Sequence, residues 1–217
     1  MSFSFSDLNI SKGRAALISF LESNFGEEAE NLIKKFDALT DAYFQFNSVI
    51  NISALRTVDD VYIKHYLDSI YPYKHFVGGV CDVGCGGGFP CLPLAIITEN
   101  NYLGIDGVGK KLRLISIAAE KLGLKNVTGE HVRAEELFKV KKFDTVCARA
   151  VADIDTALGF CAPLCKNGGK IILYRTQTDE RAVGKTEQKN KIKLSDIIDY
   201  ELPCTDIKRR LFIYEKL

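Results

Sequence analysis

Hydrophobic residues recur at steps of three and four through the first third of the chain. Leu17 and Leu21 form one such pair, and Leu32 and Phe36 continue the pattern. This spacing places apolar side chains along one face of a helix. We therefore expect residues 1–76 to form a helical extension that packs on the rest of the protein.

From Val80 to Tyr174, short apolar runs alternate with longer segments of helical period. Such alternation is typical of a parallel, doubly wound sheet with helices on both faces. Two closing apolar runs leave no room for a long helix between them, which predicts a terminal antiparallel pair. The expected fold of residues 77–217 is α/β, with a mostly parallel seven-stranded sheet and a C-terminal antiparallel strand. After the first strand, we expect strands at 102–106, 126–131, 143–148, 170–174, 197–202 and 210–214, helices at 91–98, 109–123 and 155–165, and a turn at 166–169.

A polar segment precedes this domain. Thr57 is followed three residues later by Asp60, which predicts a helix start. The helix carries Lys64, His65 and Asp68. A lone histidine on a helix is most often a structural hydrogen-bonding residue, but the nearby Arg56 and Lys64 keep a binding role open.

Composition narrows the choice of partners. The 217 residues carry a formal net charge of +1, with 26% charged and 47% hydrophobic residues, which is ordinary for a globular protein. A nucleic-acid partner would therefore have to be held by a local basic patch. The lysines of segment 178–193 are typical of a solvated helix face. No apolar run reaches the roughly 20 residues of a membrane span, and the N-terminus lacks a basic region followed by an apolar core. We expect a cytoplasmic protein without a membrane partner.

The cysteines predict neither disulfides nor a metal site. There are seven, an odd number, and they lie in apolar segments such as 80–82 and 146–148. This favours small buried side chains in a reducing compartment. No Cys-x-x-Cys spacing occurs, so we expect no metal. Cys161 and Cys165 are one helical turn apart and are expected to face the core.

The chemistry centres on Val80–Pro90, read as Val-Cys-Asp-Val-Gly-Cys-Gly-Gly-Gly-Phe-Pro. An apolar run ends in Asp82 and then in Gly84, Gly86 and Gly88, just before a segment able to form a helix. A strand that ends in such a turn can wrap an adenosine-type cofactor, because glycine accepts positive φ and adds no side chain against the ligand. The alternative is a glycine-rich turn without a ligand.

The spacing of these glycines separates two kinds of cofactor. A dinucleotide fingerprint needs glycine at the first, third and sixth places, and the sixth place is Phe89 counted from Gly84 and Cys91 counted from Gly86. The remaining pattern, Asp-x-Gly-x-Gly-x-Gly, resembles motif I of S-adenosylmethionine-dependent methyltransferases. The order of the predicted elements matches the Rossmann-like class I methyltransferase fold.

Further candidates follow later strands, where open α/β sheets bind their ligands. Asp106 ends the second strand and can accept hydrogen bonds from both ribose hydroxyls, although it could instead be a turn residue before Gly107. Ala134 and Glu135 follow the third strand, and in a methyltransferase-type sheet the turn after this strand passes over the adenine. Arg149 ends the fourth strand, facing the methyl donor, and is our candidate for a positioning residue.

Seven short motifs carry a resemblance to one family. They read Asn51-Ile-Ser-Ala-Leu-Arg, Lys64-His-Tyr-Leu-Asp-Ser, Asp82-Val-Gly-Cys-Gly-Gly-Gly-Phe-Pro, Gly109-Lys-Lys, Arg133-Ala-Glu-Glu-Leu, Ala148-Arg-Ala and Arg210-Leu-Phe-Ile-Tyr-Glu-Lys. From about residue 40 onward the chain resembles small-subunit ribosomal RNA methyltransferase G, the bacterial 16S rRNA guanine-N7 methyltransferase once called glucose-inhibited division protein B. Carried over by residue, the resemblance implies that S-adenosylmethionine is contacted by Gly84, Phe89, Ala134, Glu135 and Arg149.

The complete set of expected site residues combines the motif, the strand ends and this resemblance. For the cofactor S-adenosylmethionine it is Asp82, Gly84, Gly86, Gly88, Phe89, Asp106, Ala134, Glu135 and Arg149. For RNA phosphate it is Arg56, Lys64, His65, Lys110, Lys111 and Arg175, which together with Arg149 would form one basic face. The expected partner is 16S ribosomal RNA or the small ribosomal subunit, bound by a monomer.

The chain departs from the family pattern at four places. Cys91 stands where the family usually has glycine, Gly107 and Ala148 stand where serine is common, and Arg175-Thr176 replaces a customary Lys-Gly. None of these removes the expected cofactor site. The last could alter how the target base or its phosphate is held.

Transfer of a methyl group to guanine N7 needs no general base, because the attacking lone pair carries no proton. Orientation and removal of water should supply the rate, which suits a chain with three histidines and no obvious acid–base pair. A cytosine-C5 enzyme would need a cysteine nucleophile near the fourth strand, and an exocyclic-amine enzyme usually shows Asn/Asp-Pro-Pro-Tyr/Phe where this chain has Ala-Arg-Ala-Val. A small-molecule methyltransferase, an NAD-dependent oxidoreductase and a non-catalytic nucleotide-binding regulatory module remain alternatives.

Overall fold

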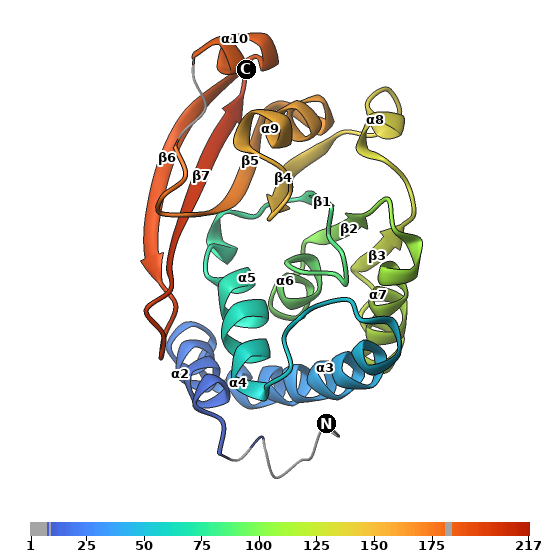
Figure 1. The fold of residues 1–217 in the computed structure, drawn as a ribbon, viewed down its shortest axis with the longest axis vertical. Helices are drawn as coiled ribbons and strands as arrows, with labels where there is room; N and C mark the ends of the chain where they lie inside the picture. Colours follow the sequence, from blue (N-terminus) through green and yellow to red (C-terminus); the bar gives the residue numbers. More distant parts are fainter. Residues whose placement is uncertain (1–7, 9, 181–183) are drawn as a thin grey trace.

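A twisted seven-stranded sheet runs through the molecule in the order β3-β2-β1-β4-β5-β7-β6 (Figure 1). The computed structural model describes residues 8, 10–180 and 184–217. Pairing is parallel from β3 to β5, and β7 runs antiparallel to both β5 and β6. The strands are β1 (Gly79–Val83), β2 (Asn101–Ile105), β3 (Val127–Glu130), β4 (Phe143–Arg149), β5 (Cys165–Thr176), β6 (Ile192–Glu201) and β7 (Lys208–Lys216). The expected α/β fold, with its C-terminal antiparallel strand, is confirmed.

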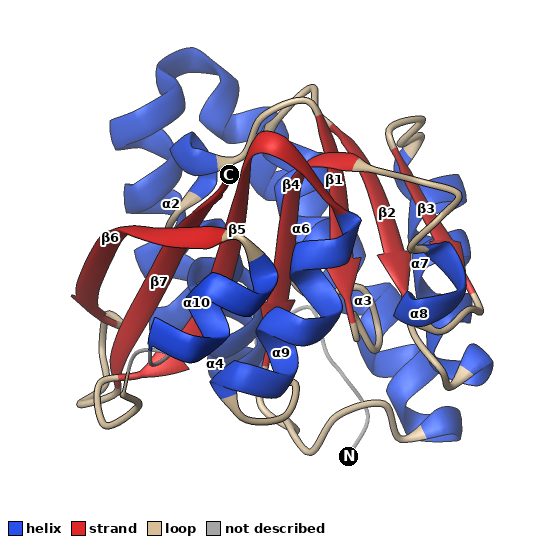
Figure 2. Cartoon of the chain, turned by 90° about the horizontal axis from the view of Figure 1, so that it is seen from above, coloured by secondary structure: helices blue, strands red, loops and turns tan. Residues whose placement is uncertain are grey.

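Helices cover both faces of the sheet (Figure 2). Those on one face are α2 (Lys12–Phe25), α3 (Ala29–Ile50), α6 (Cys91–Ile97) and α7 (Gly109–Leu122), and those on the other are α8 (Ala134–Leu137), α9 (Ile154–Cys161) and α10 (Gly184–Asn190). The short helical pieces are η1 (Gly26–Glu28), α4 (Val58–Asp60), η2 (Val61–Leu67), α5 (Asp68–Ile70), η3 (Tyr73–His75) and η4 (Ala162–Leu164). None of the helices in the described ranges is long and apolar enough to cross a membrane.

In the central strands, successive apolar side chains point to opposite faces of the sheet, which explains why helices cover both faces. In β4, Val146 and Ala148 belong to the core beneath α9, whereas Cys147 between them belongs to the core beneath α3 and α6. In β5, Ile172 likewise faces away from its neighbours Ile171 and Leu173. Because successive strand residues point to opposite faces, a strand that is apolar throughout must be covered on both sides.

Most predicted helix boundaries agree with the structure. Thr57 accepts a hydrogen bond from the Asp60 amide at the start of α4, and α7 ends at Gly123 in the left-handed conformation. The segment from Val61 to Leu67 is a π-helix, in which the Asp68 amide bonds to the carbonyl of Ile63. This widened turn was not predicted, because the apolar pattern does not distinguish a π-helix from an α-helix.

Two strands begin well before the positions that the apolar pattern predicted. β5 begins at Cys165, so the expected turn at 166–169 lies inside the strand, where Gly168 takes a positive φ and the register with β4 shifts. β6 begins at Ile192, and Lys193 pairs with Glu215 of β7 instead of lying on the expected solvated helix. In both cases a neighbouring strand supplies pairing that a local pattern cannot reveal.

Candidate cofactor and acceptor site

The loops after β1, β2 and β4 meet at one edge of the sheet, where β1 lies between β2 and β4. The strand order changes direction here, because the chain returns from β3 at one edge to β4 on the far side of β1. Such a switch point is where open α/β sheets bind ligands. The loop after β1 is the glycine-rich stretch predicted to hold the cofactor.

Backbone bonds hold this glycine loop against the end of β2. The amides of Gly84 and Cys85 both donate to the carbonyl of Ile105, at 2.9 and 3.1 Å. The Gly86 amide donates to Asp106 Oδ2 at 2.9 Å, and the Val108 amide donates to Asp106 Oδ1 at 2.7 Å. Asp106 therefore fixes the shape of two loops at once.

Glycine is required at the first position of the loop. Gly84 has φ +70°, a conformation that side chains disfavour. A Cβ atom added there would lie 2.5 Å from Cγ2 of Val151, which belongs to the loop after β4. The two loops thus touch at a point where no side chain fits.

A cavity of about 320 Å³ opens beside these loops, within the size range of small-molecule sites. We call it the glycine-loop pocket. Its lining is Val83, Gly84, Ile105, Asp106, Gly107, Val108, Val132, Arg133, Ala134, Glu135, Val151 and Phe160. Four of the residues predicted for the cofactor, Gly84, Asp106, Ala134 and Glu135, are brought together here. Apolar walls with the carboxylates of Asp106, after β2, and Glu135, in α8, suit a flat aromatic base joined to a ribose with two hydroxyl donors, so the residues fit S-adenosylmethionine.

Asp82, Gly88 and Phe89 lie beneath the loop and do not line this pocket. A Cβ atom on Gly88, which has φ +96°, would lie 2.7 Å from Leu92 Cδ1, so its place in the motif serves packing. Phe89 is buried and stacks on the His65 ring at 4.1 Å. Spacing predicts that these residues belong to the motif, but it does not say which of them reach the cavity.

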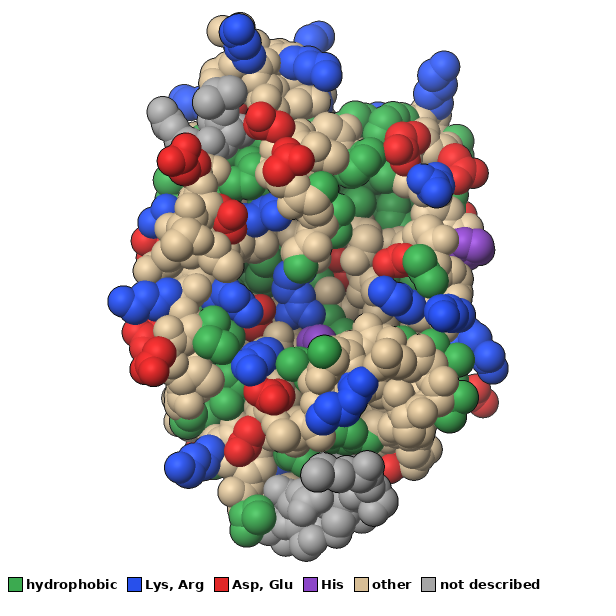
Figure 3. Space-filling view, viewed as in Figure 1, with side chains coloured by type: hydrophobic (Ala, Val, Ile, Leu, Met, Phe, Trp, Pro, Cys, Tyr) green, Lys and Arg blue, Asp and Glu red, His purple; other side chains and the backbone are tan. Residues whose placement is uncertain are grey.

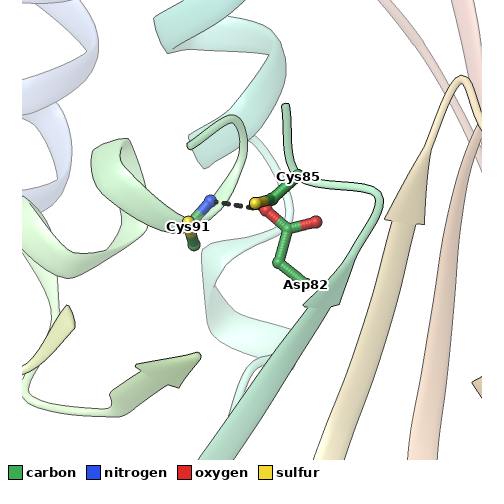
Figure 4. A group of neighbouring side chains, drawn as sticks. All are labelled: Asp82, Cys85 and Cys91. Carbon is green, nitrogen blue, oxygen red and sulfur yellow. Dashed lines mark hydrogen bonds between the residues drawn. The ribbon is translucent and has the colours of Figure 1, made fainter. Parts of the chain in front are cut away.

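Asp82 is a buried acid whose carboxylate faces backbone and thiols (Figure 4). Its Oδ2 accepts the Cys91 amide at 3.1 Å, and its buried Oδ1 has no hydrogen-bond partner in the described structure. Burial raises the pKa of Asp82 to about 6. One ligand atom each from Asp82, Cys85 and Cys91 lies within 4.8 Å of the others, so the expectation of no metal stays a prediction.

A second cavity, of about 380 Å³, lies between β4, β5 and the segment around η2. We call it the arginine pocket. Its lining is Ser53, Leu55, Lys64, His65, Asp68, Arg149, Ala150, Tyr174, Arg175, Thr176, Asp179 and Arg209. Arg149, which was predicted to contact the cofactor, lies here and does not line the glycine-loop pocket. The alternation of β4 explains this, because Ala148 and Arg149 point to opposite faces of the sheet.

Arg149 is held on several sides. Its Nη1 donates to the carbonyl of Lys64 at 3.2 Å and to Ser69 Oγ at 3.2 Å, and it approaches Asp68 Oδ2 at 3.4 Å. Its guanidinium carbon lies 5.9 Å from the centre of the Phe89 ring. A side chain fixed by so many contacts is suited to orienting a neighbour.

Asp68 is the central acid of this pocket and was missed as a site residue. Its side chain is 4% exposed, and its Oδ1 accepts the Tyr200 hydroxyl at 2.7 Å. Arg209 Nε lies 3.4 Å from the same oxygen. Asp68, Arg149 and Arg209 come from parts of the chain that are far apart in sequence, so no local motif could join them.

His65 and Arg175 are less available to phosphate than expected. The His65 ring lies between Arg149 Nη2 at 3.3 Å and Ser53 Oγ at 3.1 Å. Burial, and secondarily the charge of Arg149, lower the pKa of His65 to about 2, so the ring is neutral near pH 7 and adds no positive charge. Arg175 donates to the backbone carbonyls of Val151 and Ala152.

The other predicted basic residues lie outside both pockets. Arg56 bonds to the carbonyl of Ser53 and to the Asn51 side chain. Lys110 and Lys111 lie in the first turn of α7. On the face shown in Figure 3, basic and acidic side chains are mixed around a central hollow. The arginine pocket thus brings together Lys64, His65, Arg149 and Arg175, while the single basic face stays a prediction.

The two cavities adjoin through the loop after β4. Ala150 lines the arginine pocket, and the next residue, Val151, lines the glycine-loop pocket. A group bound in one cavity would therefore be separated from a group in the other by a single short stretch of backbone.

The chain is similar in sequence to known proteins of one family. The family model of rRNA small subunit methyltransferase G (GidB) matches residues 32–213. A protein named ribosomal RNA small subunit methyltransferase G from Lactobacillus johnsonii is 33% identical over 198 residues, covering 85% of this chain and 83% of the relative. One of the same name from an Exiguobacterium species is 36% identical, covering 77% of this chain and 75% of the relative.

A solved structure supports the fold at lower identity. Magnesium protoporphyrin IX methyltransferase from Synechocystis, with bound S-adenosylmethionine, superposes with a TM-score of 0.59 at 17% identity and covers 95% of this chain and 98% of its own. At that identity the likeness extends to the fold alone.

Proposed function

Because this chain belongs to the rRNA small subunit methyltransferase G family, we propose that it transfers the methyl group of S-adenosylmethionine to N7 of a guanine in 16S ribosomal RNA. The observation that carries the proposal is the pair of adjoining cavities at the switch point, one with the chemistry of an adenosine site and the other rich in arginine. The substrate is the finer part of the proposal, since it rests on the names of the relatives.

In this proposal the glycine-loop pocket binds the methyl donor. S-adenosylmethionine supplies an electrophilic methyl group on a sulfonium. An ionised carboxylate can accept about four hydrogen bonds, and Asp106 uses two of them for backbone amides. The remaining two acceptor sites can take hydrogen bonds from the two ribose hydroxyls. Ala134 and Glu135 lie where the adenine would pass, at the start of α8.

The arginine pocket receives the target guanine. Arginine and lysine donors suit the O6 atom of guanine and the phosphates beside it, and a carboxylate can accept from the edge that carries its N–H groups. N7 attacks with a lone pair, so the protein must orient the base and exclude water. The neutral His65 bonds to Arg149 and Ser53 and so holds the wall of the pocket, and it serves as neither general acid nor general base in this step.

The N-terminal part takes part in this site. Lys64, His65 and Asp68 of the segment around η2 form one wall of the arginine pocket. We therefore treat residues 1–76 as an extension that completes the acceptor site of the methyltransferase domain, 77–217, in a protein that acts as a monomer. The rate of methyl transfer would therefore depend on the contact between the extension and the methyltransferase domain.

The test is to incubate the protein with methyl-labelled S-adenosylmethionine and either small ribosomal subunits or naked 16S RNA, and to map the labelled nucleotide. We expect label on one guanine, and we expect that N7-deazaguanine at that position abolishes it. Binding to RNA should weaken steeply as salt rises, because phosphate contacts release counterions. Label on small molecules alone, or binding of NAD in place of S-adenosylhomocysteine, would contradict the proposal.

A further inference from the structure

The loop between the two pockets has an unusual backbone. Ala150 and Ala152 have φ of +56° and +45°, which is left-handed for residues other than glycine. Such a conformation costs roughly 1–2 kcal/mol per residue and persists only where the surroundings impose it. The residue between them, Val151, is the one whose methyl group packs against Gly84.

Arg175, at the end of β5, supplies the surroundings. Its Nη1 donates to the carbonyl of Ala152 at 2.8 Å, and its Nη2 donates to the carbonyl of Val151 at 3.1 Å. The Nε atom is buried and has no hydrogen-bond partner among the described residues. The planar guanidinium thus spans two successive carbonyls, a geometry that a lysine ammonium cannot reproduce.

Resting on the proposed function, we propose that Arg175 is a positioning residue for methyl transfer, which holds Ala150–Ala152 as the wall between donor and acceptor. The loop contributes Ala150 to the arginine pocket and Val151 to the glycine-loop pocket. A shift of this loop changes the distance and angle between the two bound groups while leaving the remaining lining of each pocket in place.

Binding of RNA phosphate and positioning of the loop are two roles for Arg175 that substitution can distinguish. If it bound RNA phosphate, its charge would matter and lysine would serve. If it holds the loop, the fork of N–H donors matters and lysine fails in this chain, even though the family customarily has lysine at this place, because here the two carbonyls of the loop are bonded by one guanidinium. Misplacement of reacting groups by about 1 Å can lower a rate by about 100-fold. We therefore expect Arg175→Lys to lower the single-turnover rate by about 10- to 100-fold, with the affinity for RNA and S-adenosylhomocysteine within about twofold of wild type.

Four measurements test this. The first is the single-turnover rate of Arg175→Lys, with Arg210→Lys as the matched control, because Arg210 on β7 pairs in register with Arg175, forms its ion pair with the exposed Asp199 and lines neither pocket. The second is the salt dependence of RNA binding, which should not change in Arg175→Lys. The third is the methyl-transfer rate of Arg175→Ala, which added guanidinium should restore and ammonium at equal ionic strength should not. The fourth is hydrogen exchange at residues 150–153, which should become faster in both Arg175 variants.

A normal rate for Arg175→Lys, together with a smaller salt slope for Arg175→Gln, would overturn the proposal and assign Arg175 to phosphate. Unchanged hydrogen exchange in Arg175→Ala would also overturn it. The exchange measurement does not depend on activity, so a wild-type protein that fails to methylate 16S RNA refutes the proposed function without deciding the role of Arg175.

Discussion

The two pockets are built from different parts of the polypeptide. The glycine-loop pocket is formed by loops that follow successive strands, and backbone amides determine its shape, with Asp106 bound to two of them. The arginine pocket is formed by side chains from the segment around η2, from β4 and β5, and from β7. The glycine-loop pocket is therefore shaped chiefly by main-chain bonds between loops, and the arginine pocket chiefly by charged side chains.

This difference indicates which substitutions should damage each pocket. Backbone bonds tolerate many side chains nearby but not a change in glycine or in the acid that anchors them. A network of buried charges tolerates no missing member, because a charge left without its partner keeps the full penalty of burial. The stability of the fold should therefore depend more on the arginine pocket, and the affinity for the methyl donor more on the glycine-loop pocket.

The largest expected effect comes from Asp68→Ala. It would leave Arg149, Arg209 and the Tyr200 hydroxyl facing an uncharged cavity. Removing one member of a buried ion network costs about 3–5 kcal/mol. We expect the free energy of unfolding to fall by about 3 kcal/mol, the low end of this range. The reason is that Arg149 keeps its bonds to Lys64 and Ser69, and the ion pairs that are lost are long. Urea unfolding measures it.

The control is Asp199→Ala, whose carboxylate forms a two-point ion pair with Arg210 on the exposed sheet surface. Exposed pairs contribute at most about 1 kcal/mol. Equal losses for the two variants would show that the arginine pocket is no more dependent on its charges than the surface is. Asp68→Asn should fall between them, since it keeps the shape and one acceptor but loses the charge.

Four of the residues that line the glycine-loop pocket could be predicted from the sequence. The glycines, Asp106 and Ala134-Glu135 each follow a recognisable strand, and parallel strands bring their ends to one edge. Spacing could not tell which glycine lines the cavity and which packs beneath it. That depends on Leu92 and Val151, which press on Gly88 and Gly84 from other segments.

The arginine pocket could also be predicted only in part. Lys64, His65 and Arg149 were expected at one site, and the structure brings them together. Asp68 and Arg209 were missed because their pairing depends on how β7 inserts between β5 and β6. The bonds from Arg175 to a strained loop were also missed, since nothing in the letters Ala-Val-Ala predicts a left-handed backbone.

The next effect, on the methyl donor, comes from Asp106→Ala. Hydrogen bonds to a charged group contribute roughly 1.5–3 kcal/mol, and this carboxylate also anchors the amides of Gly86 and Val108. We expect S-adenosylhomocysteine to bind about 10- to 100-fold more weakly by calorimetry. Binding of RNA to the same variant should stay within about twofold. A matching loss of RNA affinity would mean that the two pockets are coupled, and unchanged affinity for the cofactor analogue would reduce Asp106 to a turn residue.

The smallest effect is a difference in pH dependence between the two regions. Burial raises the pKa of Asp82, beneath the glycine loop, from 3.8 to about 6. The folded state therefore holds a proton that the unfolded state releases, and Asp82 adds stability as pH falls through 6. Burial and then Arg149 lower the pKa of His65, in the arginine pocket, from 6.5 to about 2. Its contribution is present above pH 6.5 and is lost as pH falls.

Between pH 7 and pH 5 the two contributions oppose each other, at about 1 kcal/mol gained from Asp82 and about 1–2 kcal/mol lost from His65. Wild type should therefore change little over this range. Asp82→Asn removes the gain, so its free energy of unfolding should fall more steeply on acidification than that of wild type. His65→Gln removes the loss, so its stability should rise. Urea titrations at pH 7, 6 and 5 compare the three proteins, and parallel curves would mean that neither group titrates differently on folding. Opposite deviations of the two variants from wild type would show that the titrations of Asp82 and His65 change the free energy of unfolding in opposite directions.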